Sequence, residues 1–183
     1  PKLRAGSLPN SENWFIVETV PSAAPFQALE EALLKVAVNR VINLRAGLEA
    51  PDGLHSMVEK LLPSGSELLL VIDQFEELFT LNSDEAVQAR YLDNLVHAFS
   101  HPESRVRVII TMRADFYDKP LQFRNFGQVL RQRMDTVLPL APEELTEAIV
   151  KPAQMVGVEY EAGLVDTILA AVGAQPGILP LLQ

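Results

Sequence analysis

The residues best suited to chemistry gather directly after an apolar run. Positions 68–72 are all aliphatic, and Asp73, Glu76 and Glu77 follow at once. A continuous apolar run is typical of a strand buried on both faces of a parallel sheet, and open α/β sheets bind ligands where such strands end. We therefore expect Asp73 to hold Mg²⁺, partly through water, because Mg²⁺ gives up its water shell reluctantly.

The two glutamates have two interpretations. A carboxylate within reach of a terminal phosphate can orient an attacking water and accept its proton, and Glu77 is the stronger candidate for this role over Glu76. The alternative is that both acids cap the helix that follows, because negative charge is favourable at a helix start.

Arg113 stands just past a second apolar run, residues 106–112. If that run forms the strand beside residues 68–73, Arg113 opens into the same crevice, where a fixed guanidinium can contact terminal phosphate oxygens. The alternative is an ion pair with Asp115 or with one of the acids at the end of the first strand.

The elements that must position these side chains alternate between strands and helices. We expect strands at 14–20, 68–73, 106–112 and 136–140, and helices at 25–44, 54–62 and 84–99, with helical turns at 121–132. This alternation favours an α/β fold with a parallel sheet. After Pro142 the pattern is helical only, at 143–156, 162–172 and from 178 onward, and Pro152 is expected to kink or split the first of these helices. We therefore expect a partial α/β core at 1–141 and the start of a helical subdomain at 142–183.

Composition narrows the class of protein further. The 183 residues include 15 basic and 24 acidic side chains, a net charge of −9, so direct nucleic-acid binding is not expected. There is no cysteine, which allows a reducing cytoplasm, and no apolar stretch reaches the roughly 18 residues of a membrane span. We expect a cytoplasmic protein without membrane contact. The histidines His55, His97 and His101 lack metal-ligand spacing and are expected to be solvated or packed.

Several short segments stand in a fixed order along the chain. They are 73–80 (Asp-Gln-Phe-Glu-Glu-Leu-Phe-Thr), 111–117 (Thr-Met-Arg-Ala-Asp-Phe-Tyr), 140–145, 148–153 and 176–182. In this order they resemble the Walker B region, the sensor 1 segment and the helical subdomain of the bacterial STAND nucleotidases, P-loop signal-transduction ATPases with numerous domains. The novel STAND branch, often joined to WD-repeat propellers, is the most similar.

The resemblance implies a P-loop NTPase-like parallel sheet, ATP and Mg²⁺ as the cofactors of the full-length parent, and Arg113 as the sensor 1 arginine. It also implies that Pro180 lies against the bound nucleotide. Two residues separate Gly177 from Pro180, however, where the wider class usually has one.

Residues 1–6 resemble the tail of the helix that follows the P-loop, yet no Gly-x-x-x-x-Gly-Lys-Ser/Thr sequence occurs in the chain. The resemblance therefore implies a fragment that begins just after this Walker A loop and lacks the strand before it. The edges of the strands at 106–112 and 136–140 would then be unpaired. We expect ATPase activity in the parent protein and none in this chain alone.

The leading hypothesis is part of a regulatory switch that binds and hydrolyses ATP, in a parent that self-associates or controls effector and repeat domains. A degenerate scaffold or interaction module that keeps the fold without nucleotide is the alternative, and the sequence upstream of Pro1 would discriminate the two. A phosphate-accepting receiver domain is disfavoured, because no lysine stands directly after the last expected strand and the helical tail is superfluous to such a domain.

Overall fold

A computed structural model describes residues 3–172 of the chain. The chain divides into two compact units, Pro1–Met134 and Asp135–Gln183. Each unit is described by itself. The helix expected from residue 178 onward lies outside the described residues.

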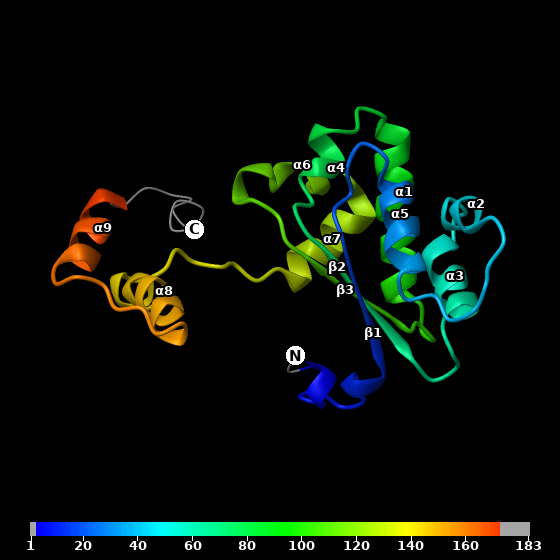
Figure 1. The fold of residues 1–183 in the computed structure, drawn as a ribbon. Coiled ribbons are helices and arrows are strands. Elements are labelled where there is room, and N and C mark those ends of the chain that lie inside the picture. The colour runs from blue at the N-terminus through cyan, green and yellow to red at the C-terminus, as the bar shows by residue number, and fades with distance from the viewer. Residues whose placement is uncertain (1–2, 173–183) are drawn as a thin grey trace. The chain divides into compact units, whose positions relative to one another are not determined.

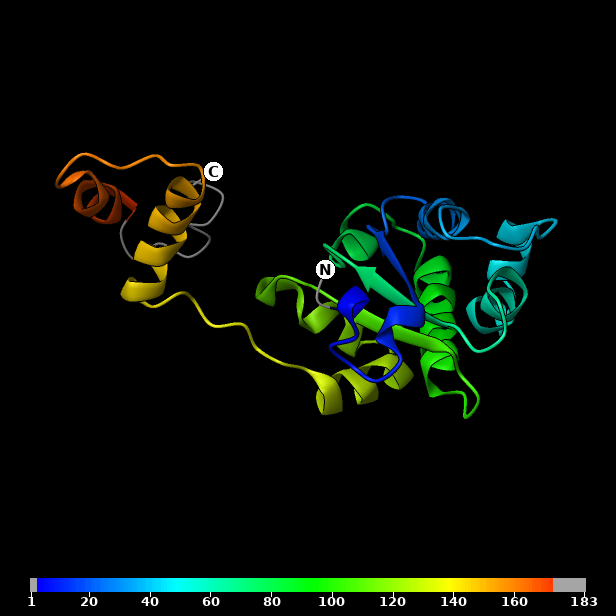
Figure 2. The ribbon, with the colours of Figure 1, turned by 60° about the horizontal axis from the view of Figure 1, so that its bottom comes forward.

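The first unit is built on a parallel sheet in the order β1-β2-β3, formed by Trp14–Thr19, Glu67–Ile72 and Val106–Ile110. The strands lie side by side in Figures 1 and 2. These are the three strands that the sequence predicts first. Thr19 pairs with Ile72, and Ile72 pairs with Ile110, so all three strands end at one level.

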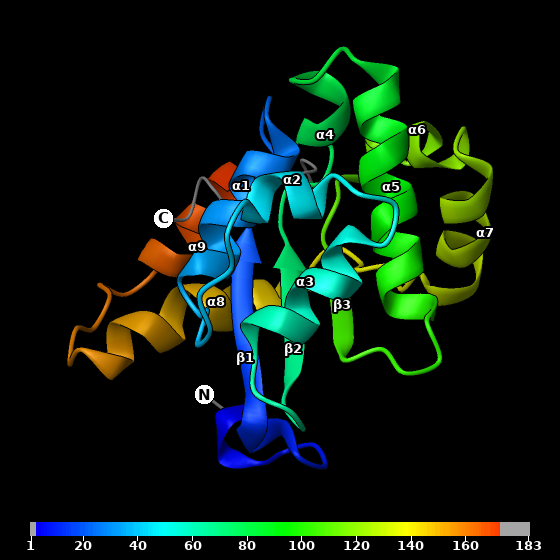
Figure 3. The same ribbon diagram turned by 90° about the vertical axis from the view of Figure 1, so that its right-hand side faces the viewer.

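Helices α1, α3 and α5 cover one face of this sheet (Figure 3). The helical segments of the unit are η1 Leu3–Ala5, η2 Ser11–Asn13, α1 Pro25–Leu34, α2 Leu44–Leu48, α3 Gly53–Leu61, α4 Glu77–Thr80, α5 Glu85–Ser100, η3 Ala114–Phe116, α6 Asp118–Leu121 and α7 Arg124–Arg133. The start of α5 is fixed by Asp84, whose carboxylate accepts the backbone N–H groups of Ala86 and Val87 at 2.9 and 3.2 Å. Such a cap satisfies donors that the first helical turn leaves unpaired.

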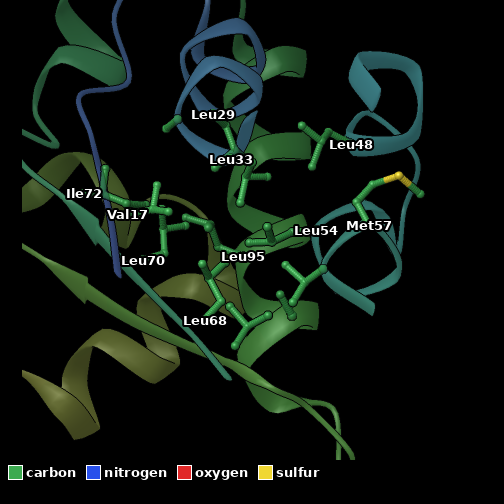
Figure 4. Close-up of a cluster of buried hydrophobic side chains, with 14 of the residues drawn as sticks. Val17, Leu29, Leu33, Leu48, Leu54, Met57, Leu68, Leu70, Ile72 and Leu95 are labelled. Atoms are coloured by element: carbon green, nitrogen blue, oxygen red, sulfur yellow. The ribbon is translucent and has the colours of Figure 1, made fainter. Parts of the chain in front are cut away.

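The core lies between this face of the sheet and the helices (Figure 4). Leu68, Leu70 and Ile72 of β2 are fully buried. Alternate strand residues share a face, so these three side chains point toward the helices together. From the helical side, Leu33 of α1 and Leu95 of α5 are 1% exposed and meet them. This packing fixes β2, and therefore the position of the acids that follow it.

Two expectations of secondary structure are wrong, and a third is wrong in part. The helix expected at 25–44 ends at Leu34, because the chain then turns and the N–H groups of Val38 and Asn39 donate to the Leu61 carbonyl at 3.1 and 3.0 Å. Residues 136–140 form no strand; Pro139 lacks an N–H donor, and no described strand pairs with them. Finally, Pro152 does not split the helix expected at 143–156, because α8 (Pro142–Met155) continues through it, whereas the expected kink stays a prediction.

The second unit contains α8 and α9, which spans Leu164–Val172. Ile149 is its buried aliphatic residue, and the Tyr160 hydroxyl donates to the Ile149 carbonyl at 3.4 Å. Glu144 in the first turn of α8 accepts the N–H of Ala141 at 2.8 Å, which closes the start of the helix. Within residues 3–172, no helix is long and apolar enough to cross a membrane.

Candidate functional site

Asp73 stands directly after β2, and its side chain is exposed. Its backbone N–H donates to the Thr19 carbonyl at 2.9 Å, which extends the pairing with β1 by one residue. On the other side, the hydroxyl of Thr111 donates to Oδ1 of the Asp73 carboxylate. Asp73 is thus held between the ends of both neighbouring strands, and among the described residues no hydrogen bond occupies its second carboxylate oxygen.

Thr111 ties the whole turn after β2 to the end of β3. Its N–H donates to the Ile72 carbonyl at 3.0 Å, and its carbonyl accepts the N–H of Phe75 at 3.0 Å. Its hydroxyl also accepts the N–H of Gln74 at 3.3 Å. Backbone and side chain of one threonine therefore hold residues 72–75 in place.

The turn itself is strained and anchored. Gln74 has φ of +50°, in the left-handed region that residues other than glycine, asparagine and aspartate rarely adopt. Phe75 follows with no exposed surface and stacks on Phe126 of α7, with ring centroids 5.6 Å apart. The buried ring on one side and Thr111 on the other hold Gln74 in this conformation.

Glu76 and Glu77 leave the anchored turn at the start of α4, and both are half-buried. Glu76 occupies the N-cap position of α4 but makes no side-chain cap bond; its carboxylate instead accepts the backbone N–H of Arg113 at 3.4 Å. Glu77 lies in the first turn, with its N–H bonded to the Gln74 carbonyl at 2.9 Å. The Glu76 carboxylate therefore lies beside the backbone that follows β3, and the backbone of Glu77 lies one residue further into α4.

Arg113 follows β3, and the pairing of β2 with β3 brings its backbone beside the acids. Its guanidinium does not extend toward Asp73. It donates twice to the Asp115 carboxylate, at 3.1 and 2.8 Å, and lies 5.7 Å from the centre of the Phe116 ring. The hydrogen bond and charge of Asp115 raise the pKa of Arg113, and the charge of Glu76 adds to this. The ion pair is the alternative that the sequence leaves open.

The carboxylate oxygens near the strand ends suit a hard cation that takes few ligands from the protein. Among residues 3–172, no group of three or more histidine, cysteine, aspartate or glutamate side chains is arranged to hold a metal ion. The exposed Asp73 oxygen fits Mg²⁺, which usually takes one or two carboxylates and keeps several waters. Asp73 also lines a pocket beside α1 with Thr19 and Lys35.

The remaining predicted residues are Pro180 and the three histidines. Pro180 lies outside the described residues, so its contact stays a prediction. Three histidines, His55, His97 and His101, come together where α3 packs on α5, with the ring centroids of His55 and His101 4.1 Å apart.

Thr111 is a site residue that the sequence analysis does not include among its candidates. Its signal in the sequence is a hydroxyl residue at the end of an apolar strand.

A family model described as "Novel STAND NTPase 1" matches residues 1–183. No curated protein and no solved structure matches the chain.

Proposed function

The chain belongs to the novel STAND NTPase 1 family, and from this premise we propose that it supplies the acidic half of a regulatory ATP site. The observation that carries the proposal is the arrangement around Asp73. A carboxylate at the end of a buried parallel strand is oriented by Thr111, the residue directly after the next strand, and two glutamates follow where the chain turns into α4. Ligands of open α/β sheets bind at this end of the strands.

Each residue has a proposed role. Asp73 holds Mg²⁺ through its free oxygen, and Thr111 keeps the carboxylate in one orientation. Glu77, or else Glu76, orients the attacking water and takes its proton. Mg²⁺, when bound with ATP, would neutralise charge on the phosphates. Arg113 would contact the terminal phosphate with the N–H groups that its pair with Asp115 leaves over, because that pair uses only Nε and Nη2.

The phosphate-binding half is proposed to come from outside the 183 residues. The sequence contains no Gly-x-x-x-x-Gly-Lys-Ser/Thr loop to surround the β- and γ-phosphates with N–H groups. In the described sheet β3 is an edge strand, so a further parallel strand that carries such a loop has a free edge to pair with. This chain alone should therefore neither bind ATP tightly nor hydrolyse it.

In the parent, nucleotide state would control how the helical subdomain packs on the α/β core. The parent would in turn self-associate or control effector and repeat domains such as WD-repeat propellers, in the cytoplasm. The division into two compact units joined at Met134 and Asp135 supports such a switch, because units with separate cores can move as bodies.

The second candidate is a scaffold of the same fold that does not use nucleotide. The observation that favours it is Arg113, whose guanidinium donates two hydrogen bonds to Asp115. Under this alternative the pair is structural, and charge at the strand ends has no ligand.

Nucleotide binding by the chain extended with its natural preceding sequence separates the two candidates. The switch predicts Mg²⁺-dependent ATP binding by calorimetry that Asp73→Asn weakens, whereas the scaffold predicts no binding in either form. Asp93→Asn, at an exposed carboxylate of α5, is the matched control and should leave binding unchanged.

A further inference from the structure

The parallel sheet has a free edge at β1. In the order β1-β2-β3, this strand pairs with β2 alone, and no described strand lies on its other side. In Figure 3 it is the outermost strand of the sheet, with α1 beside its carboxyl end. A free strand edge presents a row of backbone donors and acceptors that can pair with a further extended chain.

The register of the sheet shows which backbone groups of β1 are free. The Thr19 carbonyl accepts the N–H of Asp73 on the β2 side at 2.9 Å. Because successive residues of a strand face opposite neighbours, Val17 faces β2 as well, whereas the N–H and C=O groups of Ile16 and Glu18 face away from it. Within residues 3–172, no backbone hydrogen bond outside the sheet engages these outward groups.

A pocket opens beside this edge, between β1 and α1. Its volume is about 360 Å³, and Thr19, Ala28, Glu31 and Lys35 contribute to its walls. A strand added to β1 would point alternate side chains toward this pocket. The fold therefore offers free backbone groups for pairing and a recess for side chains, which are the two components of recognition by strand addition.

The charges around the pocket are mainly acidic. Glu18, Glu31 and Asp73 line it, and Lys35 is the one basic residue among its described lining residues. The whole chain has the same bias, with 24 acidic and 15 basic side chains. A surface of this kind attracts basic segments and repels acidic ones.

The other face of β1 is apolar beside the edge. Trp14 and Ile16 are half-buried there, and the Arg107 guanidinium lies 4.9 Å from the centre of the Trp14 ring. Alternate strand residues share a face, so these two side chains lie opposite the core residue Val17. An added strand would therefore meet apolar surface with one set of side chains and acidic surface with the other.

We propose that the free edge of β1 is a docking site for an extended basic segment of a partner protein, which adds a strand to the sheet. Its lysine or arginine side chains would point toward the pocket beside α1, and the apolar side chains between them would lie against Trp14 and Ile16. Backbone hydrogen bonds to Ile16 and Glu18 would hold the segment in register. The proposal goes beyond the nucleotide site, and its test uses no nucleotide.

Other occupants fit these features less well. A second copy that paired β1 with β1 would bring together two chains of net charge −9, with Glu18 on both sides of the contact. A nucleic acid or an anionic membrane meets the same repulsion and offers no peptide backbone to the free N–H and C=O groups. A basic peptide satisfies both the charges and the backbone.

The chain contains one tryptophan, Trp14, so its fluorescence reports on this edge directly. The probe is the synthetic peptide Lys-Val-Lys-Val-Lys-Val-Lys, which contains no tryptophan. We expect a saturable change in Trp14 fluorescence with this peptide. Glu-Val-Glu-Val-Glu-Val-Glu should give none because its charge is reversed, and Lys-Pro-Lys-Pro-Lys-Pro-Lys should give none because proline lacks the N–H donor.

Two variants separate the backbone from the charge. Ile16→Pro removes one outward N–H and leaves the bonds to β2, since proline is tolerated on edge strands, and should weaken peptide binding about tenfold. Glu31→Lys should also weaken it about tenfold, because the lysines of the peptide then meet like charge. Glu85→Lys, at an exposed glutamate of α5, is the matched control and should leave binding unchanged. Circular dichroism checks folding, and Glu31→Lys carries the test if the proline variant does not fold.

Amide hydrogen exchange followed by NMR locates the bound peptide. Exchange at Ile16 and Glu18 should slow on binding, whereas exchange at Val17, whose N–H already faces β2, should stay unchanged. Equal binding of the proline or the acidic peptide, no protection at Ile16 and Glu18, or no saturable binding would overturn the proposal. Sedimentation that shows a second copy closing this edge, in a form that Ile16→Pro abolishes, would overturn it as well.

Discussion

Thr111 donates its hydroxyl hydrogen to the carboxylate of Asp73, across the ends of two neighbouring parallel strands. The same threonine bonds the backbone on both sides of Asp73, at Ile72 and at Phe75. The residues at the end of β2 are therefore positioned by the end of β3 as well as by their own strand. A substitution at the end of β3 should change the position of the Asp73 carboxylate.

Thr111→Val tests this relationship, because valine keeps the shape and the backbone bonds but removes the hydroxyl. We expect the free energy of unfolding to fall by about 1 kcal/mol, the usual net value of a hydrogen bond, since the group is exposed. Thr111→Ser keeps the hydroxyl and should therefore retain most of this stability. Urea denaturation measures both variants, and an equal loss in the serine variant would show that the hydroxyl is not responsible.

Phe75 should be the main anchor of the acidic turn. It is fully buried and contacts Phe79 and Phe126. Phe75→Ala should destabilise the chain by about 3–5 kcal/mol, as a cavity opens in the core. Phe75→Leu should cost clearly less, and thermal unfolding distinguishes the two. A loss below about 1 kcal/mol in the alanine variant would contradict the packing described.

Asn94 of α5 should also contribute strongly to the stability of the fold. Its side chain accepts the N–H of Leu54 at 2.7 Å and donates to the carbonyls of Leu48 and Ala50 at 2.9 and 2.6 Å, while 3% exposed. Asn94→Leu leaves these groups unpaired, so we expect a loss of about 2–4 kcal/mol from the roughly 1–3 kcal/mol that each unsatisfied buried group costs. Asp93→Leu, one position away and exposed, is the control for thermal unfolding.

Tyr91 makes stability depend on alkaline pH. Its ring is buried against Phe26, its hydroxyl has no hydrogen-bond partner among the described residues, and burial raises its pKa. The unfolded chain releases this proton near the ordinary pKa of about 10 while the folded chain keeps it. Stability from this group is therefore complete below about pH 10 and falls as the pH rises above it.

Tyr91→Phe removes both the ionisable group and the unpaired hydroxyl. At pH 7 we expect stability to be unchanged or raised by up to about 1 kcal/mol. Over about one pH unit above the ordinary pKa of tyrosine, the variant should lose less stability than the parent chain. Tyr117→Phe is the control, and parallel losses in all three proteins would contradict a role of Tyr91.

The sequence predicts the parts of this fold that depend on local pattern. The apolar run before Asp73 is β2, and the run before Arg113 lies beside it as β3, so the acids and Arg113 were correctly expected to share one end of the sheet. The hydrogen bonds that Thr111 makes to residues 72–75 and the positive φ of Gln74 depend on how the strands are aligned. The hydrophobic periodicity of the sequence carries no information about that alignment. The end of α1 at Leu34 depends likewise on contacts with Leu61, far along the chain.

At 136–140 the local sequence predicts a strand that the structure does not contain. Its residues favour a strand, yet Val137 is 94% exposed and the described sheet has only three strands. A strand needs a partner for its backbone groups, and propensity alone does not provide one. The guanidinium of Arg113 is a further case, because the residue type fits both a phosphate and the Asp115 carboxylate, and the structure places it on Asp115.

We propose above that the acids after β2 serve a nucleotide site whose other half comes from outside the 183 residues. The most direct measurement is Mg²⁺-dependent ATP hydrolysis and binding by the chain extended with its natural preceding sequence, beside its Glu77→Gln variant and the 183-residue chain alone. We expect that the extended form binds and hydrolyses ATP, that Glu77→Gln binds it without hydrolysis, and that the shorter chain does neither. ATP hydrolysis by the 183-residue chain that Asp73→Ala abolishes, or an extended form that binds no ATP, would contradict it.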